Sequence, residues 1–185
     1  MLTVSSSSGQ RPDSSARLAA VRSELNPSTD LRPLFGEIGE QDLEDIRRLL
    51  LEADALLRDG AAEISAHTGV DHHTEGLMFS AGSDRAFLDG SIDADLTSFQ
   101  FELTNAEPGH ELALLTWLSV PCDEQPDRAF WCTHDLRERE TLPASALEAA
   151  AALVLDIRWL VAEAVRHPPR WILDQKHVRF MPKSS

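Results

Sequence analysis

The stretch PASALEAAAALVLDIRWLVAEAVR, from Pro143 to Arg166, decides the architecture that this sequence predicts. It has no glycine, its single proline is at the start, where a helix tolerates one, and Ser145 and Glu148 have the spacing of a capping box. Apolar residues cover most of its circumference, so other elements have to cover it. Charged residues interrupt it too often for a membrane span, which needs about 20 predominantly apolar residues. The stretch predicts a central core helix.

A second helix is predicted from Glu40 to about Ala66. Seven apolar residues recur there at steps of three and four, namely Leu43, Ile46, Leu50, Ala53, Leu57, Ala61 and Ile64. This spacing is typical of an amphipathic helix with one buried face. Gly60 falls within it and costs about 1 kcal/mol relative to alanine, so we expect it to mark a kink or an early end.

Between the two helices the sequence predicts about five short strands, over residues 76–81, 85–89, 96–104, 111–120 and 128–134. Turn signals separate them, including Gly82-Ser83-Asp84 and Asp89-Gly90. Residues 96–104 alternate between apolar and polar, which predicts one buried and one solvated face. The expected fold class is therefore α+β: an antiparallel sheet of about five strands, packed with an N-terminal amphipathic helix and a long apolar C-terminal helix.

The sequence divides into three parts. Residues 1–15 are rich in serine and predict a disordered tail. Residues 16–39 predict a short helix at 16–25 followed by a linker, and residues 40–185 predict a single α+β domain. Because no basic start precedes an apolar segment, no secretory signal is expected. A cytoplasmic protein follows, in which Cys122 and Cys132 are expected to be free thiols.

The net charge of −14 is concentrated in one region. The segment from Glu37 to Glu107 holds 17 of the 31 acidic residues but only 4 of the 17 basic ones. Such a surface repels nucleic acid and anionic lipid and favours basic partners, so we expect neither nucleic-acid nor membrane binding. A solvated face that only aids solubility is the alternative interpretation.

These observations predict a non-catalytic, inhibitor-like or chaperone-like protein that binds a basic protein partner by charge complementarity. The expected partner-binding residues are Glu44, Asp45, Glu52, Asp54 and Asp59. A homodimer is compatible with this hypothesis and also with the alternative that follows.

The alternative is a small-molecule-binding protein or a metal-dependent enzyme. Histidine and cysteine are ligands for zinc, and a Cys-His pair can also form a nucleophile. The candidates for a metal site or pocket are His67, His72, His73, Cys132, His134, Trp117 and Trp131. The histidine spacing matches no standard zinc motif, and two cysteines with one histidine are one ligand short of a closed zinc site. No cofactor is therefore expected, and zinc belongs to the alternative only.

Overall fold

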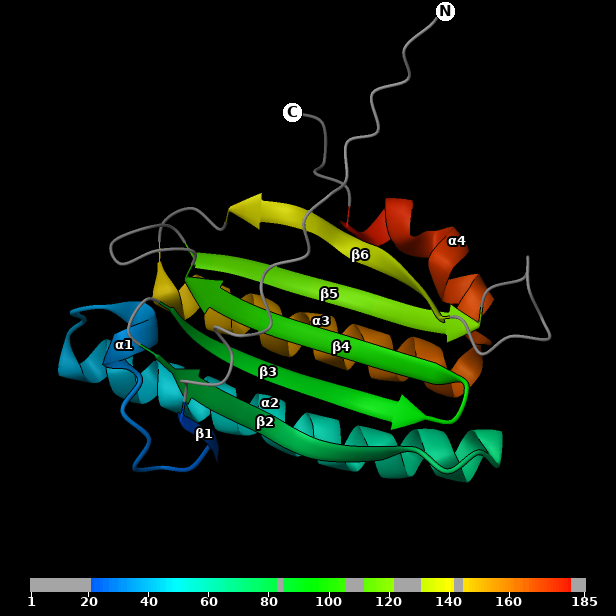
Figure 1. The fold of residues 1–185 in the computed structure, drawn as a ribbon, viewed down its shortest axis with the longest axis horizontal. Coiled ribbons are helices and arrows are strands. Elements are labelled where there is room, and N and C mark those ends of the chain that lie inside the picture. Colours follow the sequence, from blue (N-terminus) through cyan, green and yellow to red (C-terminus); the bar gives the residue numbers. More distant parts are fainter. Residues whose placement is uncertain (1–20, 83–84, 106–111, 122–130, 142–144, 181–185) are drawn as a thin grey trace, which may run out of the picture.

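An antiparallel sheet with two long helices on one face forms the frame of the molecule (Figure 1). The structure, a computed structural model, describes residues 21–82, 85–105, 112–121, 131–141 and 145–180. In chain order the described elements are β1 (Val21–Glu24), α1 (Arg32–Phe35), α2 (Glu40–Thr68), β2 (His73–Ala81), β3 (Ala86–Ala94), β4 (Thr97–Asn105), β5 (Leu112–Pro121), β6 (Trp131–Thr141), α3 (Ala146–Arg166) and α4 (Pro169–Phe180). The six strands are hydrogen-bonded in sequence order, each antiparallel to the next. The predicted α+β class is confirmed, with six strands rather than about five.

Helix α2 packs on β2 and β3, while α3 packs on β4 and β5. The seven apolar positions that predicted α2 are all buried. The helix continues through Gly60 to Thr68, so the expected early end is wrong. A Cβ atom on Gly60 would lie 2.5 Å from Cγ2 of Val161 on α3. Gly60 is therefore explained by close packing between the two helices and not by a break in α2.

Helix α3 begins where the sequence places its cap. The Ser145 hydroxyl accepts a hydrogen bond from the Glu148 backbone N–H at 3.1 Å, as in the first half of a capping box. The helix ends at Arg166, and His167 separates this end from the two prolines that cannot continue it. Asp156, in the middle of α3, is buried and accepts a hydrogen bond from the Thr116 hydroxyl of β5 at 3.1 Å. A polar contact thus joins the core helix to the sheet.

Strand β3 runs through Asp89-Gly90, so the turn predicted there is wrong. A Cβ atom on Gly90 would lie 2.7 Å from Cδ1 of Leu57, which shows that α2 approaches the sheet too closely for a side chain. The chain turns instead at Asp95 and Leu96.

The predicted alternation of β4 holds on its inner face, where Phe99, Phe101 and Leu103 are buried. Its outer face is less solvated than predicted, because Glu102 and Thr104 are buried as well.

The segment before α2 differs from the prediction. Residues 21–24 form the edge strand β1 and not the end of a helix, and Arg22 forms an ion pair with Asp89 at 2.8 Å. The linker contains the short helix α1, and its Leu31 and Leu34 are buried in the core. The predicted tail of residues 1–15 lies outside the described residues.

Cys132 on β6 is in a disulfide, so the expectation of free thiols is wrong for this residue. The sequence has one other cysteine, Cys122, which lies outside the described residues. Within the described ranges, none of the helices has the length and hydrophobicity needed to cross a membrane.

Candidate functional site

Four of the five carboxylates predicted to bind a partner form ion pairs within the protein, and Asp54 and Glu44 are two of these four. The Asp54 carboxylate accepts a hydrogen bond from the Leu77 backbone N–H at 2.7 Å and pairs with Arg58 at 2.9 Å. It therefore fastens α2 to β2. Glu44 pairs with Arg47 of its own helix at 3.1 Å.

The other three predicted carboxylates lie in one row along α2. Asp45, Glu52 and Asp59 repeat every seven residues, and Glu63 follows four residues later. Residues at these intervals share one side of a helix. We call these four residues the acidic row. Glu52 forms an ion pair with Arg158 of α3, so the row runs along the side of α2 that borders α3.

The two halves of the acidic row differ in their pairing. Asp45 pairs with Arg48 at 3.1 Å, and Glu52 pairs with Arg158. The side-chain hydrogen bond from Gln41, with a second contribution from Arg48, holds the pKa of Asp45 below its ordinary value. Asp59 and Glu63 are exposed, and within the described part of the chain no ion pair joins them to an arginine or lysine.

An exposed leucine of α3 lies one helical turn from the arginine that pairs with this row. Leu155 of α3 is 52% exposed and precedes Arg158 by three residues, which places the two side chains one turn apart on the same side of α3. Among the described residues, only Val70 and Leu96 are other large apolar side chains with comparable exposure. The outer surface of the helix layer thus combines an apolar side chain with neighbouring carboxylates.

The predicted metal ligands do not come together. The His67 ring nitrogen Nδ1 lies 2.9 Å from the Glu63 backbone carbonyl at the end of α2, and His73 is exposed at the start of β2. Across the described ranges, no three histidine, cysteine, aspartate or glutamate side chains form a group that could hold a metal ion.

The remaining candidates lie on the adjacent strands β5 and β6, with Trp117 on the opposite side of the sheet from His134. Cys132 is in a disulfide, and His134, two residues along β6, pairs with Leu118 on the side of the sheet that faces the helices. Trp117 pairs with Asp135 on the opposite side. The backbone of Trp131 forms the start of β6.

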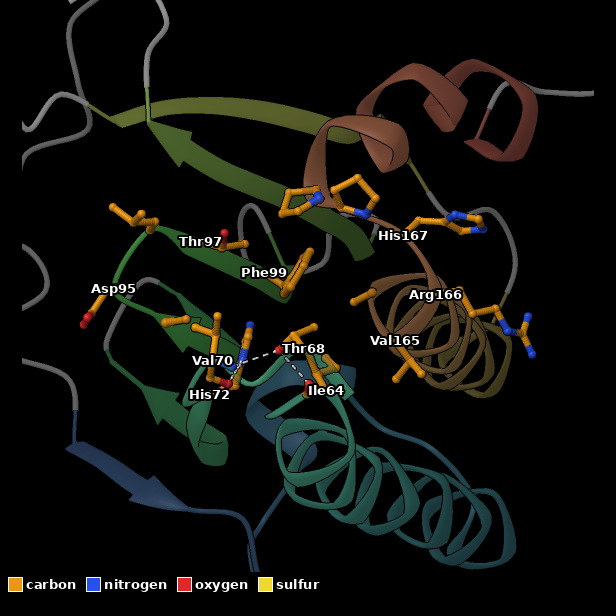
Figure 2. Close-up of a pocket in the computed structure, with 15 residues that line it drawn as sticks. Ile64, Thr68, Val70, His72, Asp95, Thr97, Phe99, Val165, Arg166 and His167 are labelled. Carbon is orange, nitrogen blue, oxygen red and sulfur yellow. Dashed lines mark hydrogen bonds between the residues drawn. The ribbon is translucent and has the colours of Figure 1, made fainter. Parts of the chain in front are cut away.

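A pocket of about 620 Å³ opens at the end of the molecule where α2 and α3 both terminate (Figure 2). We call it the end pocket. Its walls come from the end of α2, the β3–β4 turn, Phe99 of β4 and the corner between α3 and α4. His72 is the only predicted candidate that lines it, and none of the described tryptophans does. Two apolar residues at turn positions, Val70 after Gly69 and Leu96 after Asp95, are the sequence signal that could have indicated it.

No protein-family model, no curated protein and no solved structure matches this chain.

Proposed function

We propose that this chain is a non-catalytic binding protein that docks a basic, amphipathic segment of a protein partner on the outer surface of its helix layer. One observation supports the proposal: Arg158, which pairs with Glu52 of the acidic row, lies one helical turn from the exposed Leu155 of α3. An apolar anchor near a row of carboxylates is a pattern that a basic amphipathic helix can complement.

The two parts of this surface contribute differently to binding. An exposed ion pair is worth only about 0.2–1 kcal/mol, so the carboxylates mainly orient the partner and speed its association. Covering a leucine side chain contributes about 1.5–3 kcal/mol when its burial is complete, and about half as much when half of it is already buried. Leu155 is half-exposed, so its contact and two or three ion pairs are of comparable size.

The existing ion pairs define where the partner's charges are expected. Arg48 and Arg158 already neutralise part of the charge on Asp45 and Glu52. The partner's basic residues should therefore contact Asp59 and Glu63 first, because these carboxylates are exposed and have no arginine or lysine partner in the described ranges.

The experiment uses a fluorescein-labelled helical peptide of about 18 residues, with leucines on one face and lysines on the other, and a twin with glutamates in place of the lysines. Fluorescence anisotropy gives the dissociation constant for the unmodified chain and for the double variant Asp59→Lys/Glu63→Lys. The control is Glu24→Lys/Glu37→Lys, which makes the same change in net charge at exposed residues on β1 and before α2. We expect about tenfold weaker binding for the first variant, little change for the control, and no binding of the glutamate peptide.

Equal weakening in both double variants would mean that net charge alone attracts the peptide, and the proposal would be lost. Binding that does not weaken when salt is raised from about 50 to 300 mM would contradict the electrostatic part, since exposed charges are screened over about 10 Å at 0.1 M salt.

The cytoplasmic location and the homodimer also remain proposals. The disulfide at Cys132 counts against a reducing cytoplasm, because disulfides are rare there. Acid-quenched thiol alkylation in cells of the host tests this location: labelling of Cys132 without prior reduction supports a reducing compartment, and labelling only after reduction opposes it. Sedimentation velocity of the unmodified chain distinguishes monomer from dimer.

A further inference from the structure

The end pocket lies between the ends of the two long helices and the β3–β4 turn. Helix α2 ends at Thr68, where Gly69 adopts the left-handed conformation with φ 72°, and α3 ends at the residue before His167 and the two prolines. Strands β3 and β4 meet in the turn at Asp95 and Leu96, which lines the pocket from the side of the sheet. Phe99 and the last turn of each helix thus face an unfilled space of about 620 Å³. This volume lies in the range of small-molecule sites, about 300–1,000 Å³.

The mouth of the end pocket carries exposed apolar side chains. Val70 is 48% exposed and Leu96 is 66% exposed, and both line the pocket. They come from two segments, the α2–β2 connection and the β3–β4 turn, which are brought together only by the fold. Two apolar side chains on the rim of a concave apolar surface can close over a bound molecule and gain burial in doing so.

The charged residues of the pocket lining do not face its interior. Figure 2 shows the Arg166 side chain directed away from the cavity beyond the end of α3, and Asp95 directed outward from the β3–β4 turn. The Thr68 hydroxyl is already used, because it donates to the Ile64 carbonyl at 2.8 Å and accepts from the Val70 N–H at 3.3 Å. A charged ligand would lose its hydration here without a compensating partner.

The His72 ring supplies a polar atom of the lining whose hydrogen-bonding role can be assigned. The Nδ1 atom of His72 lies 2.8 Å from the Val70 carbonyl oxygen. A carbonyl can only accept, so Nδ1 carries the hydrogen, and Nε2 of the neutral ring is a hydrogen-bond acceptor. A ligand that uses this atom therefore has to supply a donor.

We infer that the end pocket binds an uncharged, largely apolar small molecule that carries one hydroxyl or N–H donor. This site is separate from the proposed protein-docking surface, because neither Leu155 nor any member of the acidic row lines the pocket. The inference therefore stands or falls independently of the proposed function.

The probe is N-phenyl-1-naphthylamine, a neutral apolar fluorophore with a single N–H donor, titrated into the full chain with its emission and the melting temperature as readouts. We expect one probe per chain and a rise in melting temperature with probe concentration. The double variant Val70→Ser/Leu96→Ser should bind about tenfold more weakly. The matched control Leu155→Ser also replaces an exposed leucine by serine and should bind the probe normally. His72→Leu should lower the affinity about fivefold for this probe but not for its N-methyl analogue, which lacks the donor.

Three results would overturn the inference. Absence of saturable binding shows that the pocket takes no neutral apolar ligand. Equal affinity in all variants shows that the probe binds elsewhere. The third result is that Val70→Ser/Leu96→Ser weakens binding of the lysine peptide but not of the probe. This result would assign the pocket to side chains of a protein partner. Because all four substitutions replace residues that are not fully buried, circular dichroism should show an unchanged fold in each variant.

Discussion

Replacing Gly60 by alanine tests how closely α2 and α3 pack. In an isolated helix this substitution stabilises by about 1 kcal/mol, because alanine loses less backbone entropy than glycine. Here the added Cβ would lie 2.5 Å from Cγ2 of Val161 and 3.1 Å from its Cγ1. Ordinary contacts at such positions are 3.4–4 Å, so the two helices have to separate or Val161 has to move.

Val161 has little freedom to move. It is buried, and a valine in a helix strongly prefers one rotamer. Overpacking of this kind costs about 1–3 kcal/mol. Set against the gain of about 1 kcal/mol from helix propensity, the free energy of unfolding should fall by up to about 2 kcal/mol.

The assay is urea unfolding of four proteins: the unmodified chain, Gly60→Ala, Val161→Ala and the double variant. Without the Val161 methyl groups, alanine at position 60 no longer clashes, so its effect should change sign and stabilise by about 1 kcal/mol. The coupling energy of the cycle should be about 1–3 kcal/mol. If Gly60→Ala stabilises the unmodified chain as much as it stabilises Val161→Ala, the helices do not pack as described.

Gly76→Ala should lower the free energy of unfolding by about 2–4 kcal/mol, because φ is +82° and the new Cβ would displace the carboxylate that holds the start of β2; thermal unfolding measures it. Thr116→Val removes the buried hydroxyl that donates to Asp156 and should cost about 1–2 kcal/mol in urea unfolding, whereas Thr116→Ser keeps the donor and should cost less. Carboxyl NMR titration should place the pKa of Asp45 below its ordinary value of 3.8, and Gln41→Ala should raise it towards that value. Since the folded pKa is depressed, the contribution of Asp45 to stability is present above the unfolded pKa and is lost as the pH falls through the folded one.

The parts of the fold that follow from local periodicity could be predicted. The apolar spacing of α2 and the cap and proline signals of α3 each depend on residues within a few turns of one another, and the structure places their limits within three residues of those expected. Features that depend on tertiary contacts could not be predicted from the sequence. Glycine usually weakens or ends a helix or strand, so Gly60 and Gly90 look like break positions in the sequence. Each is instead explained by close packing against a residue distant in sequence: Val161 for Gly60 and Leu57 for Gly90.

In the candidate sites, too, local features could be predicted from the sequence and features that depend on tertiary contacts could not. Charge concentration in α2 is visible in the sequence, but which carboxylates remain available is not, because the partners of Asp54 and Glu52 are 23 and 106 residues away. Strand β1 is only four residues long and exists through pairing with β2, so its local sequence resembles the end of a helix. The end pocket is assembled from segments about 25 and 100 residues apart, and no single segment predicts it.

The most direct test of the proposed function is to locate the bound peptide on the protein. Two-dimensional ¹H–¹⁵N NMR spectra of the full chain, recorded during titration with the lysine peptide, report which backbone amides change their environment. The account predicts that the shifts concentrate on α2 from Asp45 to Glu63 and on α3 around Leu155. Shifts concentrated on the open face of the sheet or at the end pocket, with α2 unaffected, would contradict it.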